Sequence, residues 1–181
     1  MGSNVHVALL RGINVGGKNK LPMKDLAAMF AGSGCRAIQT YIQSGNVVFE
    51  ANATLARRVP ALVSAAIAER FGLQVPVIIR SAGQLGNVAR DNPFLGKGAA
   101  VTALHVAFLT DQPDAKKVAA LDPQRSPGDE FVARGSEIYL HCPKGLARTK
   151  LTNAYFDSRL ATTSTIRNWN TVLKLLELAG G

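Results

Sequence analysis

Residues 37–51 read AIQTYIQSGNVVFEA, and this stretch decides the fold. Two runs rich in β-branched and aromatic side chains flank a short break at Gln43, Ser44 and Gly45. Such runs are typical of strands, and a short glycine-containing break joins antiparallel neighbours, so we predict a β-hairpin. The break has a second interpretation, because the amides of Gln43 and Asn46 can donate to an anion or a base edge. We favour a plain turn unless the loop that follows the first predicted strand lies beside it.

The segment before this hairpin predicts a strand and a helix. Residues 5–11 are mostly apolar and are followed by a glycine, which predicts a strand that ends there. Pro22 suits a first helical turn, and apolar residues at the spacing of one helix face continue to Phe30, so we expect a helix that ends at Gly32 or Gly34.

The segment after the hairpin completes a known order of elements. Residues 55–70 predict a long helix, and residues 74–80, QVPVIIR, predict a further strand. The order β-α-β-β-α-β is that of a ferredoxin-like sandwich, in which helices cover one face of an antiparallel sheet.

The second half of the chain partly repeats this order, as β-α-β-β-α-α. We therefore predict an α+β protein of two related units, with mainly antiparallel sheets and helices packed on them. The predicted boundaries are a ferredoxin-like unit at 1–80, a linker or mobile loop at 81–102 and an α+β unit at 103–181. Within the second unit we expect strands at 103–111, 130–135 and 136–142 and helices at 113–121, 150–160 and 166–179.

Composition limits the classes of function. The chain has 181 residues, of which 47% are hydrophobic, and this is enough for a packed core. Its longest apolar stretches, about eight residues, are far below the roughly 20 that span a bilayer, and residues 1–6 are too polar to open a signal peptide, so we expect a cytoplasmic protein without a membrane partner. Cys35 and Cys142 have neither disulfide nor zinc spacing, and the three histidines are isolated. We expect no metal and no cofactor.

Positive charge is the first functional signal. The chain has 21 Lys and Arg against 12 Asp and Glu, a net charge of +9. Residues 11–24 contain four basic residues and no acid, and residues 144–174 contain six basic residues and one acid. This concentration in two segments favours an anionic partner, with nucleic acid the main candidate.

The first basic segment, LLRGINVGGKNKLP, approaches the phosphate-binding frame G-x-x-x-x-G-K-[ST] through Gly12, Gly17 and Lys18. Asn19 stands where the frame needs Ser or Thr, and the helix expected at Pro22 begins too late to cradle a phosphate in that way. Two interpretations stay open with equal weight. The glycines and cations form an adapted anion cradle, or they form a solvated turn.

The second basic segment places cations near two predicted helix starts. Arg148 and Lys150 lie at or just before the start of the helix expected at 150–160, and Arg167 and Asn168 fall in the first turn of the helix expected at 166–179. Exposed amides at a helix start favour anions, so a pair of such ends suits a phosphate or carboxylate. Ordinary caps with solvated arginines are the alternative.

Four motifs in order, LLRGINVGGKNKLPM, TYIQSGNVVF, ARTKLTNAYF and TIRNWNTV, resemble the DUF1697 family of bacterial proteins. The resemblance implies a small α+β protein and assigns no activity. Thr149 replaces the Ser expected in the third motif. The motif residues implied by the resemblance are Arg11, Asn14, Gly16, Gln43, Ser44, Asn46, Arg167, Asn168 and Asn170. With Gly17, Lys18, Arg148 and Lys150 they make up the candidate anion-binding set.

Three hypotheses of function follow. The first is a non-catalytic protein that binds nucleic-acid phosphates through a basic surface, because no nucleophile, carboxylate pair or other catalytic constellation is visible. The second is an enzyme or binding protein for a small phosphorylated ligand or nucleotide that uses residues 12–18. The third is an interaction protein with an acidic partner. A base-stacking sheet is not expected, because only Phe49 fills such a place.

Overall fold

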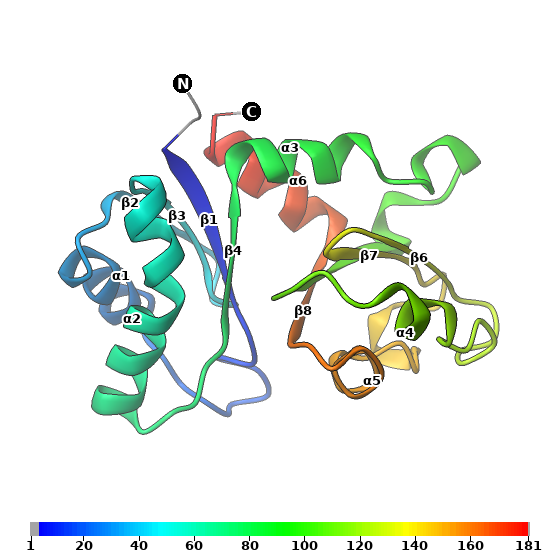
Figure 1. Ribbon diagram of the computed structural model, residues 1–181, viewed down its shortest axis with the longest axis horizontal. Coiled ribbons are helices and arrows are strands. Elements are labelled where there is room, and N and C mark those ends of the chain that lie inside the picture. Colours follow the sequence, from blue (N-terminus) through cyan, green and yellow to red (C-terminus); the bar gives the residue numbers. More distant parts are fainter. Residues whose placement is uncertain (1–3, 181) are drawn as a thin grey trace. The chain divides into compact units, whose positions relative to one another are not determined.

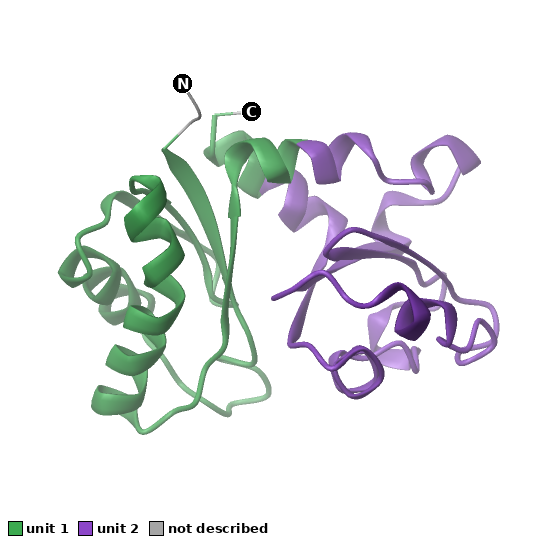
Figure 2. Ribbon diagram, in the orientation of Figure 1, with its two compact units in different colours: residues 1–86, 175–181 green, residues 87–174 purple. Residues whose placement is uncertain are grey.

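The computed structural model describes residues 4–180, which form two compact units (Figures 1 and 2). Unit 1 comprises residues 1–86 and 175–181, and unit 2 comprises residues 87–174. The boundaries fall inside two helices, α3 (Ala82–Arg90) and α6 (Trp169–Leu178). Among the described residues, no helix combines the length and the apolar character needed to cross a bilayer.

Unit 1 has the predicted ferredoxin-like order, and its strands form one antiparallel sheet in the order β2-β3-β1-β4. The predicted hairpin is strands β2 and β3. The elements are β1 (Val5–Leu10), α1 (Met23–Gly32), β2 (Arg36–Tyr41), β3 (Asn46–Glu50), α2 (Ala53–Phe71) and β4 (Val77–Ser81).

The core of unit 1 lies between this sheet and its two helices, which cover one face (Figure 1). Alternate residues of β1, Ala8 and Leu10, point into this layer with Phe49 of β3. The apolar stripes of α1 and α2 pack on them, and Phe30 and Val63 are fully buried there. Burial of each such side chain contributes about 2 kcal/mol. The spacing of the apolar residues along each element therefore determines which of its faces turns toward the core.

Unit 2 repeats the topology with the sheet order β6-β7-β5-β8, again antiparallel throughout. Two α+β units are thus confirmed. Helices α4 and α5 pack on one face of the sheet, and Phe156 is buried there with Leu109. The elements are β5 (Leu104–Leu109), α4 (Ala115–Ala119), β6 (Glu130–Arg134), β7 (Glu137–His141), α5 (Asn153–Leu160) and β8 (Ser164–Asn168).

The last predicted helix is wrong at its start. Residues 164–168 form strand β8, so unit 2 ends as a full β-α-β-β-α-β unit and not as β-α-β-β-α-α. The run of Thr and Ile side chains before Trp169 suits a strand, and Asn168 ends it by accepting a hydrogen bond of 2.8 Å from the amide of Thr171. Helix α6 therefore begins at Trp169.

Residues 81–102, expected as a linker or mobile loop, instead begin with helix α3. Ser81 and Gln84 form a capping box, because the Ser81 amide donates to Gln84 Oε1 at 2.8 Å and the Gln84 amide donates to Ser81 Oγ at 3.1 Å. Two short 3-10 turns follow, at Leu95–Lys97 and Val101–Ala103.

The two units match in detail. Strand β1 reads VHVALL and strand β5 reads LHVAFL, so His6 corresponds to His105. The amide of the residue that follows β1 or β5 donates to the connection before the last strand of the same unit. Arg11 N donates to Pro76 O at 3.0 Å, and Thr110 N donates to Thr163 O at 2.9 Å. The last strands also match, since Arg80 pairs with Val7 and Arg167 pairs with Val106.

Candidate anion-binding loops

The opening loop, residues 11–22, is a small hairpin rather than a phosphate-binding loop. The Asn14 amide donates to Asn19 O at 3.1 Å, and the Lys18 amide donates to Val15 O at 3.0 Å. Gly16 and Gly17 lie at the tip with φ of 57° and 75°, as a type I′ turn requires. Two amides are thus bonded within the loop, and helix α1 begins only at Met23, so the nucleotide-hydrolysing geometry is not formed.

Asn14 fixes the opening loop to its neighbours. Its side-chain Nδ2 donates to Leu21 O at 2.9 Å and to Gln43 O at 2.8 Å, and its Oδ1 accepts from the Leu21 amide at 2.8 Å. The backbone of Asn14 has a φ of 54°, which Asn tolerates better than most residues. The opening loop therefore lies beside the turn between β2 and β3, which is the adjacency on which the second interpretation of that turn depends.

The QSGN turn, residues 43–46, is shaped by its own side chains. Asn46 is buried, and its Nδ2 donates to Tyr41 O at 3.2 Å and to Ser44 Oγ at 3.0 Å. A Cβ at Gly45 would lie 2.7 Å from Leu10 Cβ and 2.9 Å from Ile13 Cδ1, so only glycine fits there. Ser44, Gly45 and Asn46 thus hold the turn, and Gln43 is exposed.

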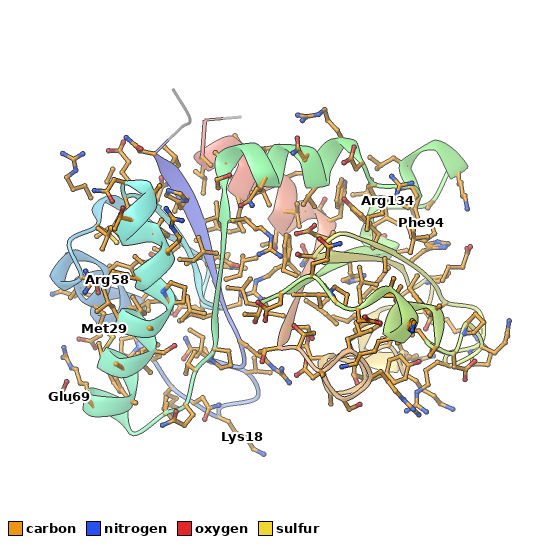
Figure 3. All side chains as sticks on the ribbon, in the orientation of Figure 1. Lys18, Met29, Arg58, Glu69, Phe94 and Arg134 are labelled. Atoms are coloured by element: carbon orange, nitrogen blue, oxygen red, sulfur yellow. The ribbon has the colours of Figure 1, made fainter. Side chains whose placement is uncertain are left out.

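The opening loop carries three cations at this edge of unit 1. Lys18 and Lys20 are exposed and Arg11 is half-buried. Lys18 extends away from the ribbon at the lower edge of the view (Figure 3). Gly16 and Gly17 are also exposed, so the tip of the loop is open to a ligand.

Arg148 and Lys150 lie in unit 2, in a second pair of loops that we call the loop pair, residues 120–129 and 142–152. Ser126, a buried residue that the sequence did not single out, joins them. Its Oγ accepts from the Lys150 amide at 3.0 Å and from Thr149 Oγ1 at 3.4 Å, and donates to Asp129 Oδ2 at 2.6 Å. The predicted helix start at 150 is wrong, because α5 begins at Asn153 behind the Thr152 cap.

The loop pair carries exposed cations. Arg125 and Lys144 are exposed together with Arg148 and Lys150. The guanidinium of Arg125 lies over the ring of Tyr155, 5.1 Å from its centroid. The loop pair also contains two acids: Asp122 is exposed, and Asp129 is half-buried and bonded to Ser126, so four exposed cations stand against one exposed carboxylate.

Arg167, Asn168 and Asn170 do not form a helix-start anion site. Arg167 is a residue of strand β8 and is 8% exposed. Its Nη1 donates to Thr165 Oγ1 at 2.7 Å and to Ile166 O at 3.0 Å. Burial lowers the pKa of Arg167 to about 10, which still leaves it charged at neutral pH. Asn168 caps α6, and Asn170 is exposed on that helix.

The comparisons with known proteins agree with this architecture. The family model described as "Protein of unknown function (DUF1697)" matches residues 4–139. The chain belongs to this family. Among solved structures, the conserved bacterial protein SP0830 from Streptococcus pneumoniae is similar over 97% of this chain and 98% of its own, with a TM-score of 0.73 and 22% identity. No curated protein matches the chain.

The DUF1697 match covers one of the two candidate regions completely. It contains the opening loop and the QSGN turn of unit 1, and it ends at Tyr139 in strand β7. Arg148, Lys150 and Arg167 lie beyond it. The predicted site residues therefore fall into one set in unit 1, inside the match, and one in unit 2, outside it.

The two thiols and the Phe49 ring, which are the other side chains considered for chemistry or base stacking, are buried in the cores of this DUF1697 chain. Cys35 and Cys142 are buried free thiols, and burial raises the pKa of Cys142 to about 11. Phe49 is fully buried and packs on Phe30 and His6, so its ring is closed to a base. Within residues 4–180, no group of three or more His, Cys, Asp and Glu side chains is placed to hold a metal ion.

Proposed function

We propose that this DUF1697 protein binds the phosphates of nucleic acid, in the cytoplasm and without catalysis, through its basic loops, which are the opening loop of unit 1 and the loop pair of unit 2. One observation carries the proposal. Each unit has one connection that is longer than the corresponding connection of the other unit, and both of these longer connections carry exposed cations. Unit 1 joins β1 to α1 through residues 11–22, whereas unit 2 joins β5 to α4 through 110–114. Unit 2 joins β7 to α5 through 142–152, whereas unit 1 joins β3 to α2 through 51–52.

Exposed and dispersed cations suit a polyanion. Lys18 and Lys20 in unit 1, and Arg148 and Lys150 in unit 2, are exposed on loops rather than gathered around buried donors. A small phosphorylated ligand needs donors that converge on one group, and the amides of Asn14 and Lys18 are bonded inside the opening loop. A phosphate backbone needs only cations at its surface, and each neutralised phosphate releases counterions.

The test is a fluorescence-anisotropy titration of the full chain with mixed-sequence duplex and single-stranded DNA and RNA at about 50 and about 200 mM salt. We expect Kd to rise by orders of magnitude across this range. The variants Lys18→Ala/Lys20→Ala and Arg148→Ala/Lys150→Ala should each weaken binding and lower the salt slope by about 2, since about 0.9 counterions are released per phosphate contact.

Matched controls remove the same charge elsewhere in each unit. Arg57 and Arg58 are exposed on α2, and Lys116 and Lys117 are exposed on α4. Alanine at either pair should leave the salt slope within experimental error of the wild type. Absence of binding at the lower salt, or an equal loss in the control variants, would show that the basic loops are not a nucleic-acid surface.

A further inference from the structure

Two exposed aliphatic side chains lie at the edge of unit 1, among the cations of the opening loop. Val15, next to the loop's tip, is 63% exposed, and Ile42, just before the QSGN turn, is 50% exposed. Burial of an exposed aliphatic side chain against a partner is favourable, and these two lie on neighbouring loops, where one partner can cover both.

Hydrogen bonds hold the backbone in place near both residues. Asn14, the residue before Val15, donates to the carbonyl of Gln43, the residue after Ile42, at 2.8 Å. Val15 also pairs with Lys18 across the glycine tip. A side chain that must enter a tight space loses little entropy on binding when its backbone is already fixed.

Ile42 has a φ of 48°, in the left-handed region that a β-branched residue seldom adopts. Its neighbours enforce this conformation, because Asn46 bonds the carbonyl of Tyr41 and Gly45 packs on the loop. A strained residue with an exposed aliphatic side chain is typical of a functional position.

The charge around the pair indicates the kind of partner. Residues 11–24 contain four basic residues and no acid. Aliphatic side chains have no π face on which an unpaired base can stack, and Tyr41, the neighbouring aromatic residue, is half-buried. Aliphatic wedges flanked by Lys and Arg are instead suited to unstack neighbouring base pairs from the minor groove of a duplex.

We infer that Val15 and Ile42 form a wedge that enters a base step of duplex DNA from the minor groove, while Lys18 and Lys20 contact the flanking phosphates. The inference rests on the proposed function and adds to it a class of ligand, the deformable duplex. Steps that unstack at low cost, such as TA, are the preferred sites.

The test uses the full chain and a duplex with 2-aminopurine at a central TA step and a fluorophore pair at its ends. Wild-type protein should raise the 2-aminopurine fluorescence and bring the ends closer. Val15→Ser/Ile42→Ser should abolish both changes, yet bind with the same salt slope and a Kd within about threefold of the wild type, because phosphate contacts supply most of the affinity. Circular dichroism checks that this variant is folded.

Two further variants complete the design. Val101→Ser removes another exposed aliphatic side chain, 43% exposed and outside the basic loops, and should behave as the wild type. Val15→Leu keeps an aliphatic wedge and should keep the 2-aminopurine signal.

The outcomes separate the inference from the function on which it rests. Duplex binding with a steep salt slope but no unstacking by the wild type would overturn the wedge and leave the proposed function standing. Absence of any duplex binding would overturn both. Flotation of the wild type, but not of Val15→Ser/Ile42→Ser, with phosphatidylserine vesicles and without duplex unstacking would overturn the wedge in favour of a membrane surface.

Discussion

Unit 1 and unit 2 share a sheet order and a hydrogen bond from the residue after the first strand to the connection before the last strand. Their long connections, however, lie at opposite ends of the sheet. The opening loop follows the C-terminal end of β1 in unit 1. The long connection of unit 2 follows β7, whose last residue His141 pairs with Leu104 at the start of β5. The sheet and its helices set the fold of both units, while the connections differ between the units and carry the exposed cations.

Glycine at the hairpin turns gives the largest expected difference between the units. Gly45→Ala should lower the free energy of unfolding by about 3 kcal/mol, because the added Cβ would lie 2.7 Å from Leu10 Cβ and the residue has a φ of 79°. Urea denaturation followed by far-UV circular dichroism measures the loss.

The matched control is Gly135→Ala in the corresponding hairpin of unit 2. Its φ is 58°, and the nearest atom to an added Cβ is Glu137 Oε2 at 3.9 Å, so only the backbone cost of about 1 kcal/mol remains. Equal losses in the two variants would contradict the tight packing of the QSGN turn on the opening loop.

Much of this fold is predictable because local and tertiary preferences agree. The hairpin, α1 and α2 follow from β-branched runs and helical spacing, and burial on the sheet reinforces both. The sequence does not predict strand β8, because Ile166 fits the apolar spacing of helix α6 and extends that helix toward its N-terminus. The signals for the strand are the Thr-rich run of β8 and the helix cap Asn168. The capping box at Ser81 and Gln84 was a readable signal for α3.

The candidate site is less predictable than the fold. The adjacency of the opening loop and the QSGN turn follows from the expected strand order. The role of Ser126 could not be predicted, because its bond to the Lys150 amide joins residues 24 apart and depends on how two loops fold together. The burial of Arg167 is not predictable from the sequence either, because arginine side chains are mostly exposed and this one lies in a motif rich in polar residues.

The fixed opening loop of unit 1 is tested by a pair of asparagines. Asn14→Ala removes three side-chain hydrogen bonds, two to Leu21 within the loop and one to Gln43 of the QSGN turn, and should cost about 2 to 3 kcal/mol of unfolding free energy. It should also speed hydrogen exchange at the Leu21 amide, which loses its acceptor.

Asn19→Ala is the control, because Asn19 has a similar φ of 48° but its side chain makes a single hydrogen bond within residues 4–180, to Gly12 O at 2.8 Å. We expect a loss smaller by about 1 kcal/mol and no change in exchange at Leu21. If both variants lose the same stability, Asn14 is not the residue that fixes the loop.

The smallest effect should come from the matched histidines of β1 and β5, which occupy different surroundings. His6 is half-buried, with Nε2 3.2 Å from Ala51 O, whereas His105 is 5% exposed and its Nδ1 has no hydrogen-bond partner among the described residues. Burial lowers the pKa of His105 in the folded chain, so below a pH of about 6.5 the unfolded chain binds more protons than the folded one.

Stability of unit 2 should therefore fall as the pH drops from about 6.5 toward the folded pKa of His105, by at most about 1.4 kcal/mol per pH unit from this group. Trp169, the one tryptophan of the chain, is buried in unit 2 and reports its unfolding by fluorescence. His105→Gln, which cannot titrate, should flatten the curve over this pH range. An unchanged slope in that variant would mean that the acid sensitivity arises elsewhere, and that the burial of His105 does not distinguish the two units in this respect.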